Sequence, residues 1–226
     1  MRHKQLSLRE KKFARTKQKL LDAALALMAQ KPLEEVTVAE ICHAAEVSYA
    51  TFFNYFARKT DLLVYFIQLW SVEVSWRARM TYEEGGGSVA AIEAIFAHTA
   101  SLCEKNPEVM EEIVAFQSRK RNMENISAIP LTIAEKALRF PQIEDFQELG
   151  DLGLESVLPP LIKTAIANGE LPSGADVDGI MLSLAVIFLG TPVVVASHRM
   201  IGLGEAYKRQ LALLWTGARG RHAGNI

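Results

Sequence analysis

The sequence predicts an all-α protein. Half of its 226 residues are apolar and 23% are charged, a balance typical of globular proteins that bury a large core. Apolar residues recur at spacings of three and four, as on one face of a helix, and long stretches contain neither Gly nor Pro. Ser and Thr, which cap helix N-termini, precede several of these stretches. We therefore expect helices and little or no sheet.

The first sixty residues predict short helices with clear start signals. A first helix is expected over residues 8–29, where the apolar residues repeat with the helical period. Thr37, followed three residues later by Glu40, has the pattern of a capping box and opens the second helix. Ser48 is an N-cap residue for a third helix over residues 49–56. Two short helices joined by a turn of three or four residues outline a helix-turn-helix unit.

The remainder of the chain predicts further helices and one flexible break. We expect these helices at about 60–80, 89–104, 107–121, 125–139, 151–168, 176–199 and 204–217. The segment EEGGGS, residues 83–88, is predicted to be a loop between two of them. We divide the chain into an N-terminal helix-turn-helix domain with a basic arm, residues 1–59, and a larger helical domain, residues 60–226.

Basic charge is concentrated at one end of the chain. Residues 1–60 hold 11 Lys or Arg and 6 Asp or Glu, although the whole chain has a formal charge of −1. Such a segment is a common footprint for nucleic acid, and a solvated terminus that aids solubility explains the same composition equally well. The two cysteines rule out a disulfide framework. We see no secretory signal at the N-terminus and expect a cytoplasmic protein.

Residues 179–197 form an uncharged run long enough to cross a membrane. Ser183, Thr191 and the interruption by Gly190 and Pro192 argue against insertion. A helix that is apolar all round can also be buried between its own core and a partner subunit. We favour the buried helix and expect no membrane partner.

Five of the eighteen aromatic residues lie within residues 49–56. On a helical wheel four of these rings share an arc of about 100°, the width of a stripe that faces a core: Tyr49, Phe52, Phe53 and Phe56. The opposite face is small or polar and can contact phosphate oxygens or base edges: Ala50, Thr51, Asn54 and Tyr55. We expect the three phenylalanines to hold the helix from behind, with Tyr49 at its edge.

The segment TVAEICHAAEVSYATFFNYFARKTDLL, with its basic first helix and helical remainder, resembles the DNA-binding domain of the TetR (tetracycline-repressor) family of bacterial transcription regulators. The resemblance covers roughly residues 13–66. It implies a DNA-binding regulator, in particular a homodimeric repressor released from a palindromic operator on double-stranded DNA by a small-molecule effector. An architectural or division-control protein of the same fold without an inducer is the alternative. A helical lipid carrier or membrane-associated protein, suggested by residues 179–197, is a third hypothesis.

The resemblance assigns DNA contacts residue by residue. Thr37 and Ser48 would place hydroxyl groups against phosphates. Tyr55 and Lys59 match positions that contact phosphates in the family. Base contacts would fall to Tyr49, Ala50, Thr51 and Asn54, with Asn54 as the best hydrogen-bonding group.

Three positions depart from the family pattern. Glu46 stands where the family usually has Gly, and a left-handed conformation there would cost about 1 kcal/mol or more. Ala39 lacks the long polar side chain that some members use to contact bases. Phe53 occupies a position that is often Tyr, so a hydrogen bond made there is lost.

The larger half implies a pocket and a dimer interface. We expect an unknown small apolar or amphipathic effector to contact four residues: Trp70, Trp76, His98 and Phe116. We expect the homodimer to form through the helices near 176–199 and 204–217, with contributions from Leu182, Val186, Leu189, Leu211, Leu214 and Trp215. No residue pattern indicates a catalytic site, a metal site or a cofactor, so we expect a protein that is not an enzyme.

Overall fold

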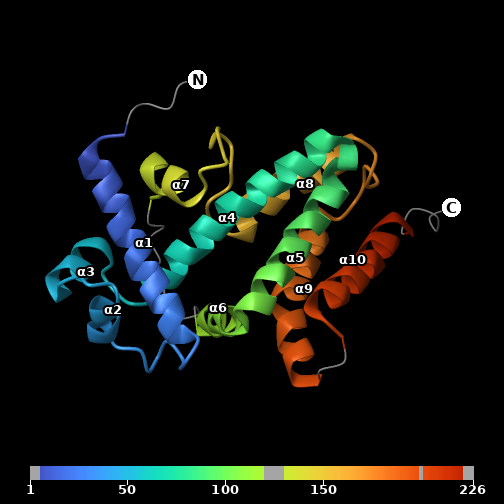
Figure 1. Cartoon of the computed structure of the whole chain (residues 1–226). Coiled ribbons are helices and arrows are strands. Elements are labelled where there is room, and N and C mark those ends of the chain that lie inside the picture. Colours follow the sequence, from blue (N-terminus) through green and yellow to red (C-terminus); the bar gives the residue numbers. More distant parts are fainter. Residues whose placement is uncertain (1–5, 120–129, 199–200, 221–226) are drawn as a thin grey trace. The chain divides into compact units, whose positions relative to one another are not determined.

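A computed structural model describes residues 6–119, 130–198 and 201–220 (Figure 1). These residues are all-α, as predicted, and contain no strand. The helices, in chain order, are α1 (Leu8–Met28), α2 (Val38–Ala44), α3 (Tyr49–Tyr55), α4 (Asp61–Thr81), α5 (Gly87–Lys105), α6 (Pro107–Arg119), α7 (Ile133–Arg139), α8 (Leu154–Ala167), α9 (Val177–His198) and α10 (Leu203–Gly220).

The helices group into two compact units. The N-terminal unit comprises Met1–Glu73 and Glu112–Gly153, and the C-terminal unit comprises Val74–Glu111 and Leu154–Ile226. The sequence-based division at residue 59 placed residues 112–153 in the larger domain. In the structure the described residues of this segment, 112–119 and 130–153, belong to the N-terminal unit, where α7 lies along α1 (Figure 1).

The short helices of the N-terminal unit begin at the predicted caps. The Thr37 hydroxyl accepts a hydrogen bond from the Glu40 amide at 3.2 Å, and the Glu40 carboxylate accepts one from the Thr37 amide at 2.8 Å. This is the reciprocal capping box. Ser48 Oγ accepts a hydrogen bond from the Thr51 amide at 3.1 Å and so caps α3. Local side-chain chemistry therefore fixes where α2 and α3 start.

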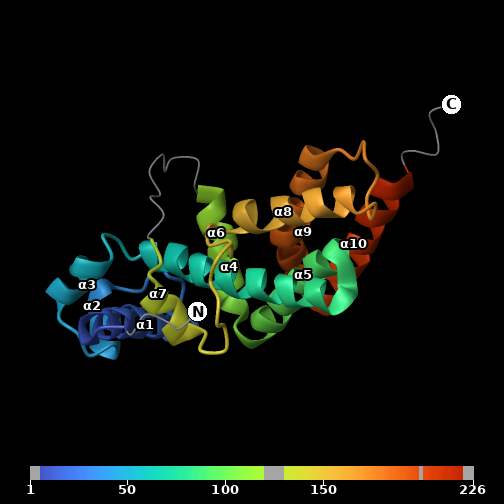
Figure 2. The same cartoon turned by 90° about the horizontal axis from the view of Figure 1, so that it is seen from above.

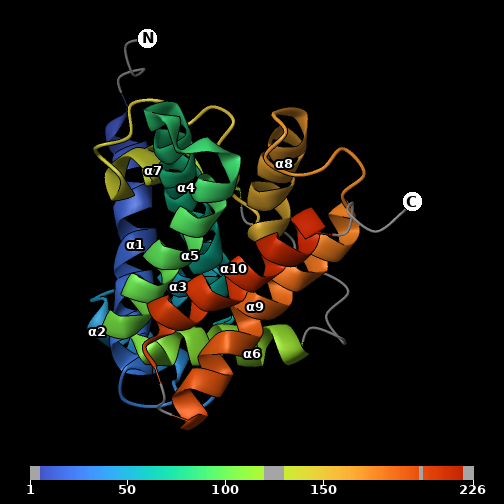
Figure 3. The ribbon, with the colours of Figure 1, turned by 90° about the vertical axis from the view of Figure 1, so that its right-hand side faces the viewer.

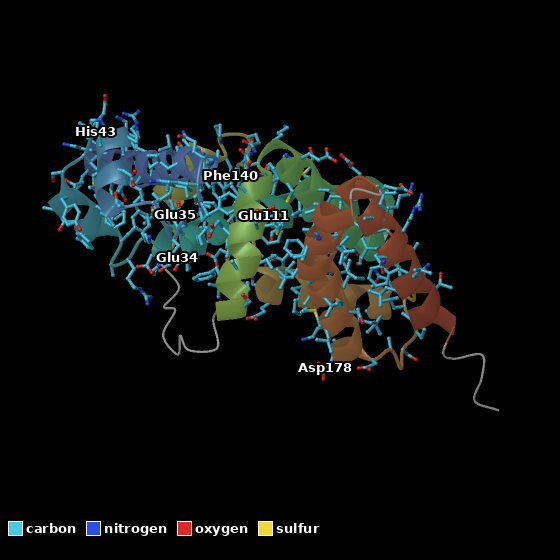
Figure 4. All side chains as sticks on the ribbon, turned by 90° about the horizontal axis from the view of Figure 1, so that it is seen from below. Glu34, Glu35, His43, Glu111, Phe140 and Asp178 are labelled. Atoms are coloured by element: carbon cyan, nitrogen blue, oxygen red, sulfur yellow. The ribbon has the colours of Figure 1, made fainter. Side chains whose placement is uncertain are left out.

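A buried ion pair ties α7 to α1. Lys17 on α1 and Glu135 on α7 are 2% and 0% exposed, and their charged groups are in contact. Lys17 Nζ also lies 4.2 Å from the ring centre of Tyr65. Gln18 donates a hydrogen bond to the Glu135 carbonyl at 3.1 Å, and Phe140, which follows α7, is buried (Figure 4). Figure 2 shows α1, α2, α3 and α7 gathered together in this unit.

The helix predicted over residues 125–139 is shorter in the structure. It begins at Ile133, after the N-cap Thr132, whose hydroxyl accepts a hydrogen bond from the Glu135 amide at 3.2 Å. The predicted start lies within residues 120–129, outside the described residues. The capping-box pattern of Thr132 and Glu135 marks this start in the sequence, whereas the spacing of apolar residues does not.

The C-terminal unit packs around α5. Helix α10 lies against α5 and α9, and α8 also contacts both of these helices (Figure 3). Its core contains Phe96 with ring centres 5.5 Å from Phe188 and 5.1 Å from Tyr207. The Tyr207 hydroxyl donates to the Phe188 carbonyl at 2.8 Å, so this buried polar group is satisfied.

The predicted break between α4 and α5 is present. A five-residue turn, η1 (Tyr82–Gly86), joins the two helices, and Gly85 and Gly87 have φ values of 88° and 79°. These left-handed values favour glycine. The Glu170 carboxylate accepts hydrogen bonds from the amides of Ser88 at 2.7 Å and Val89 at 2.9 Å, and it thereby supplies the cap that the sequence near α5 lacks.

Helix α9 exposes apolar side chains. Among the described residues, Val177–Ala196 is the one helix long and apolar enough to span a membrane, with a mean hydropathy of 2.3. Its outward residues include Leu182 at 67% exposed and Val186 at 61% exposed, while Asp178 carries the charge at its start (Figure 4). The exposed apolar residues of α9, which we call the α9 stripe, are Leu182, Val186, Val193 and Val194.

Two residues predicted for the dimer interface lie in the core of their own unit. Leu211 is 1% exposed and Trp215 is 3% exposed. The Trp215 ring N–H donates to Glu93 Oε1 at 3.1 Å. Both are therefore unavailable to a partner. On α10 the exposed large apolar residue is Leu213.

Candidate nucleic-acid interface and effector cleft

The exposed face of α3 carries two aromatic rings beside two small or polar residues. Tyr49 is 56% exposed and Phe53 is 46% exposed, and Ala50 and Asn54 are also exposed. Of the four predicted base-contacting residues, the structure therefore places Tyr49, Ala50 and Asn54 on one outward face. Thr51 is half-buried at the margin of this face.

The prediction that Phe53 holds α3 from behind was wrong. Phe52 and Phe56 are 0% and 1% exposed and fill the core position by themselves. Phe53 lies at the edge of the predicted aromatic arc, next to Ala50, and its ring remains at the surface. The helical wheel already places Phe53 at the edge of the aromatic arc. A residue at the edge of such a stripe is the first to remain exposed when the core has no room for a third ring.

The hydroxyl groups near α2 and α3 are held by local hydrogen bonds. Ser48 Oγ and Thr51 Oγ1 lie 2.7 Å apart, and Ser48 also caps the helix. Thr37 is exposed and caps α2. The predicted contacts of these groups with phosphate remain predictions.

Tyr55, at the end of α3, and Lys59, just before α4, contact neighbouring segments. The half-buried Tyr55 ring has its centre 4.7 Å from that of Phe13 on α1. Lys59 Nζ donates to the carbonyls of Leu33 and Glu34, both at 2.7 Å, and to that of Val36 at 2.9 Å. Glu34 lies in the connection between α1 and α2 (Figure 4). An ammonium group has three donors, and at Lys59 all three are directed at this connection.

The turn between α2 and α3 has the left-handed geometry for which the sequence is poorly suited. Glu46 has φ 55°, and the Val47 amide donates to the Cys42 carbonyl at 3.0 Å. Glu46 is the residue that stands in place of the usual Gly. Lys19 Nζ lies 3.8 Å from its carboxylate, with both side chains largely exposed.

Exposed basic residues also lie on α1 and α2 of the same unit. His43 lies on the outer side of α2 (Figure 4). Helix α1 carries five exposed cationic residues, namely Arg9, Lys11, Lys12, Arg15 and Lys19. Helix α3 itself, YATFFNY, contains no charged residue. An uncharged helix beside a basic helix is a suitable arrangement for contacting both the bases and the phosphates of DNA.

A cleft in the C-terminal unit contains two of the four predicted effector residues. It has a volume of about 450 Å³, within the range of small-molecule sites. Its lining consists of Trp76, Arg77, Met80, Thr81, Glu84, Ala94, Ala97 and His98. Trp70 and Phe116 do not line it, since both are buried in the N-terminal unit at 8% and 7% exposed. The lining residues Ala94 and Ala97 were not predicted.

A family comparison now adds to this geometry. Residues 20–66 match the family described as bacterial regulatory proteins, tetR family. The chain carries a TetR-family helix-turn-helix domain. The matched residues include α2, the turn at Glu46, α3 and the start of α4.

Solved structures of TetR-family regulators have the same fold over nearly the whole chain. FadR of Thermus thermophilus, a TetR-family transcriptional repressor in complex with lauroyl-CoA, is 19% identical with a TM-score of 0.63, and the alignment covers 93% of this chain and 98% of FadR. A protein of Syntrophomonas wolfei described as a TetR-family transcriptional regulator is 20% identical with a TM-score of 0.65, with coverages of 93% and 98%. FadR of Bacillus subtilis, in complex with stearoyl-CoA, is 18% identical with a TM-score of 0.61, covering 88% and 98%.

These likenesses establish the TetR-family regulator fold of the chain. No curated protein has significant sequence similarity to it. In the part of the chain that the structure describes, no group of three or more His, Cys, Asp or Glu residues is arranged to hold a metal ion.

Proposed function

We propose that this TetR-family protein is a cytoplasmic, homodimeric transcription repressor that binds a palindromic DNA operator and is released from it by a small-molecule effector. The observation that carries the proposal is the exposed, uncharged face of α3 in a unit whose helix α1 carries five exposed cationic residues. A helix of this kind can enter the major groove while cations beside it contact phosphates.

On DNA, the residues of α3 and α1 would make different kinds of contact. The Asn54 amide can donate a hydrogen bond to adenine N7 and accept one from the adenine N6 amino group. This bidentate contact distinguishes base pairs. Ala50 is small enough to let the helix approach the base edges. The exposed cations of α1 would neutralise phosphates and contribute affinity for any sequence.

The α9 stripe supports the dimer. Leu182 and Val186 are more than half exposed, and Leu213 on α10, which packs against α9, is 69% exposed. Burying such a surface against a second copy removes apolar area from water. A two-fold axis between two copies would also match the two-fold symmetry of a palindromic operator.

The cleft near Trp76 and His98 supports effector binding. Its aromatic, thioether and alanine side chains suit an apolar body, and Arg77 and His98 supply polar groups. Two proteins of similar fold bind lauroyl-CoA and stearoyl-CoA, so long-chain acyl thioesters are the first compounds to test. The effector would favour a conformation with weaker affinity for DNA. It can shift the equilibrium between the two conformations by no more than the ratio of its own affinities for them.

Selection of genomic DNA fragments by the full-length protein tests the proposal. We expect a small set of fragments with a shared palindrome, bound with an affinity that falls steeply as salt increases. Adding acyl-CoA of several chain lengths should then release the complex. Failure to bind any fragment would refute DNA binding. Specific binding that no effector reverses would favour the architectural alternative.

Asn54→Ala tests the assignment of the base contact. We expect a loss of about 1–3 kcal/mol on the selected palindrome and a relaxed preference at one position, because a bidentate contact is removed. Gln142→Ala, which removes an exposed amide that lies after α7 and outside both α3 and the expected dimer interface, is the matched control. Equal losses on the palindrome and on random DNA would show that Asn54 does not distinguish bases. Titration by fluorescence anisotropy provides both affinities.

A further inference from the structure

The α7 segment, residues 130–153, places one carboxylate in the core of the N-terminal unit. Glu135 on α7 contacts the ammonium group of Lys17 on α1, and these two side chains are 0% and 2% exposed. The proposed DNA contacts and the effector cleft do not include this pair. A buried ion pair can fix one arrangement of the groups around it while contributing little net stability. The groups around Lys17 therefore indicate what the pair does.

Lys17 lies among aromatic rings from three helices. Its ammonium nitrogen is 4.2 Å from the ring centre of Tyr65 on α4, 5.7 Å from that of Phe56 after α3, and 5.8 Å from that of Phe13 on α1. Each distance is within the range of a cation–π contact. The Phe13 ring in turn has its centre 4.7 Å from that of Tyr55, the last residue of α3. The position of the ammonium group therefore affects how α1, α3 and α4 pack together.

Helix α7 leaves its large apolar side chains exposed and meets α1 through polar groups. Ile133 and Leu138 are 60% and 39% exposed, and Arg139 Nη1 lies 3.2 Å from Asp22 Oδ1 on α1. A helix of seven residues is too short to be stable by itself. If α7 left α1, both ions of the buried pair would regain water, so no unpaired charge would remain in the core. Helix α7 can therefore exchange between a docked and a released state.

The end of the α7 segment leads directly into the C-terminal unit. Lys136 Nζ lies 3.2 Å from Asp151 Oδ2, and the Gly153 amide donates to the buried Ser71 hydroxyl on α4 at 2.9 Å. The next residue, Leu154, begins α8 and belongs to the C-terminal unit. The chain after α7 is thus held at two points just before α8 begins. A displacement of the start of α8 would act on α7 through this short connection.

We propose that docking of α7 on α1 is coupled to DNA binding, with Glu135 as the positioning residue that fixes α3 through Lys17 and its rings. The proposal rests on the proposed DNA-binding function and adds a route by which the C-terminal unit regulates it. While α7 is docked, the ammonium group stays among the rings and α1 keeps its place against α3. When α7 is released, the ammonium group turns toward water and this packing is lost. Coupling is reciprocal, so DNA binding in turn favours the docked state.

Substitutions in the full-length protein test Glu135, with a palindromic fragment from the genomic selection as the ligand. Glu135→Gln leaves the Lys17 ammonium without its counter-ion and should weaken affinity for the fragment about tenfold or more, as coupled sites commonly do. The double variant Lys17→Met with Glu135→Leu replaces the pair by apolar groups and should restore the affinity to within about threefold. Glu144→Gln, which removes an exposed carboxylate from the same segment, is the matched control and should leave the affinity unchanged.

Fluorescence anisotropy separates this positioning role from a merely structural one. Titration at high protein concentration gives the fraction of protein that binds, and titration at low concentration gives the dissociation constant of that fraction. Partial unfolding of Glu135→Gln would reduce the binding fraction and leave the dissociation constant unchanged. Loss of positioning should instead raise the dissociation constant of the folded protein.

Hydrogen exchange of the wild type tests the coupling without any substitution. The Lys136 amide donates to the Thr132 carbonyl and the Phe140 amide to the Lys136 carbonyl, so these amides report whether α7 is formed. We expect the fragment to slow their exchange about tenfold or more, and to slow that of α10 by less. This measurement decides the proposal if Glu135→Gln does not fold.

The outcomes are distinct. A raised dissociation constant in Glu135→Gln, its recovery in the double variant and slower exchange of α7 on DNA support the proposal. Equal dissociation constants for Glu135→Gln and the control, a folded double variant without recovery, or exchange of α7 unaffected by DNA overturns it and leaves DNA binding intact. Absence of wild-type binding to every genomic fragment refutes the proposed function and this proposal with it.

Discussion

Helices α3 and α9 both expose apolar side chains, yet their surroundings differ. On α3 two aromatic rings are exposed together with Ala50 and Asn54, and α1 in the same unit carries exposed cations. The α9 stripe consists of aliphatic side chains on a helix that carries no charge between Asp178 and its last described turn. Exposure alone therefore does not identify a partner. The neighbouring charge indicates a polyanion for α3 and a second apolar surface for α9.

The two helices also differ in how they are held. The capping box of α2, the Ser48 cap of α3, the Lys59 ammonium and the buried rings of Phe52 and Phe56 fix α2 and α3. The α9 stripe depends on apolar packing of the opposite side of its helix, where Leu184 and Phe188 are buried. Substitutions near α3 should therefore affect folding and DNA binding together. Substitutions in the α9 stripe should affect assembly and leave the protomer folded.

The largest effect is expected from charge in the α9 stripe. The double substitution Leu182→Glu with Val186→Glu should convert a dimer to monomers, because an unpaired charge buried in an interface costs about 3–5 kcal/mol, which is more than a hundredfold in the dissociation constant. Light scattering measures the mass. Lys163→Glu, at an exposed position on α8 and so outside both helices of the expected interface, is the control and should leave the mass unchanged. A double variant that remains dimeric would remove α9 from the interface.

Lys59→Ala tests the polar contacts behind α3. Loss of a charged donor to three carbonyls should lower the free energy of unfolding by about 1.5–3 kcal/mol. Arg58→Ala, which removes a half-exposed charge that is paired with Asp61, should change the free energy of unfolding by less than about 1 kcal/mol. Urea unfolding followed by circular dichroism compares the two. An unchanged stability together with a salt dependence of DNA binding reduced by about one would instead show that Lys59 contacts phosphate.

Glu46→Gly should stabilise the turn before α3. Glycine removes the left-handed strain at φ 55° and should raise the free energy of unfolding by about 1 kcal/mol. Glu46→Ala removes the same contact with Lys19 but keeps a Cβ atom at this φ, so it should give no comparable gain. Thermal unfolding of both variants decides between strain and charge. A gain from Ala as large as that from Gly would contradict the strain explanation.

The smallest effect concerns the capping box of α2 at low pH. The hydrogen bond from Lys31, with those from the backbone and hydroxyl of Thr37, lowers the pKa of Glu40 from its ordinary 4.5 to about 2. Because the pKa is lower in the folded protein, the ionised carboxylate stabilises the fold above pH 4.5. That contribution is lost as the pH falls toward 2. Glu40→Gln should therefore show a smaller difference in unfolding free energy between pH 7 and pH 3 than the wild type does.

Much of the N-terminal unit could be predicted because its signals are local. Thr37, Glu40 and Ser48 determine helix starts within three residues of themselves, and the structure confirms these caps. The same is true of the break at Gly85, where the backbone needs a left-handed residue. Patterns of this kind depend on neighbours in the chain, so a single sequence contains them.

The remaining features depend on contacts between distant segments. The Lys17–Glu135 pair joins helices that the sequence spacing does not relate, and nothing near Lys17 marks it as buried. Lys59 has the identity expected of a phosphate-binding residue, but its direction depends on where residues 33–36 lie. The exposure of Phe53 follows from the space left by Phe52 and Phe56. Helical periodicity fixes the side of a helix and not the volume available there.

The buried Lys17–Glu135 pair limits how this protein can be recombined with others. A fragment cut after α4 would keep Lys17 and lose α7, leaving an ammonium group in an apolar core without its counter-ion, a change that costs several kcal/mol. A transplant of the α2–α3 unit into another scaffold would therefore have to include the α7 segment, or replace Lys17 by an apolar residue such as Met.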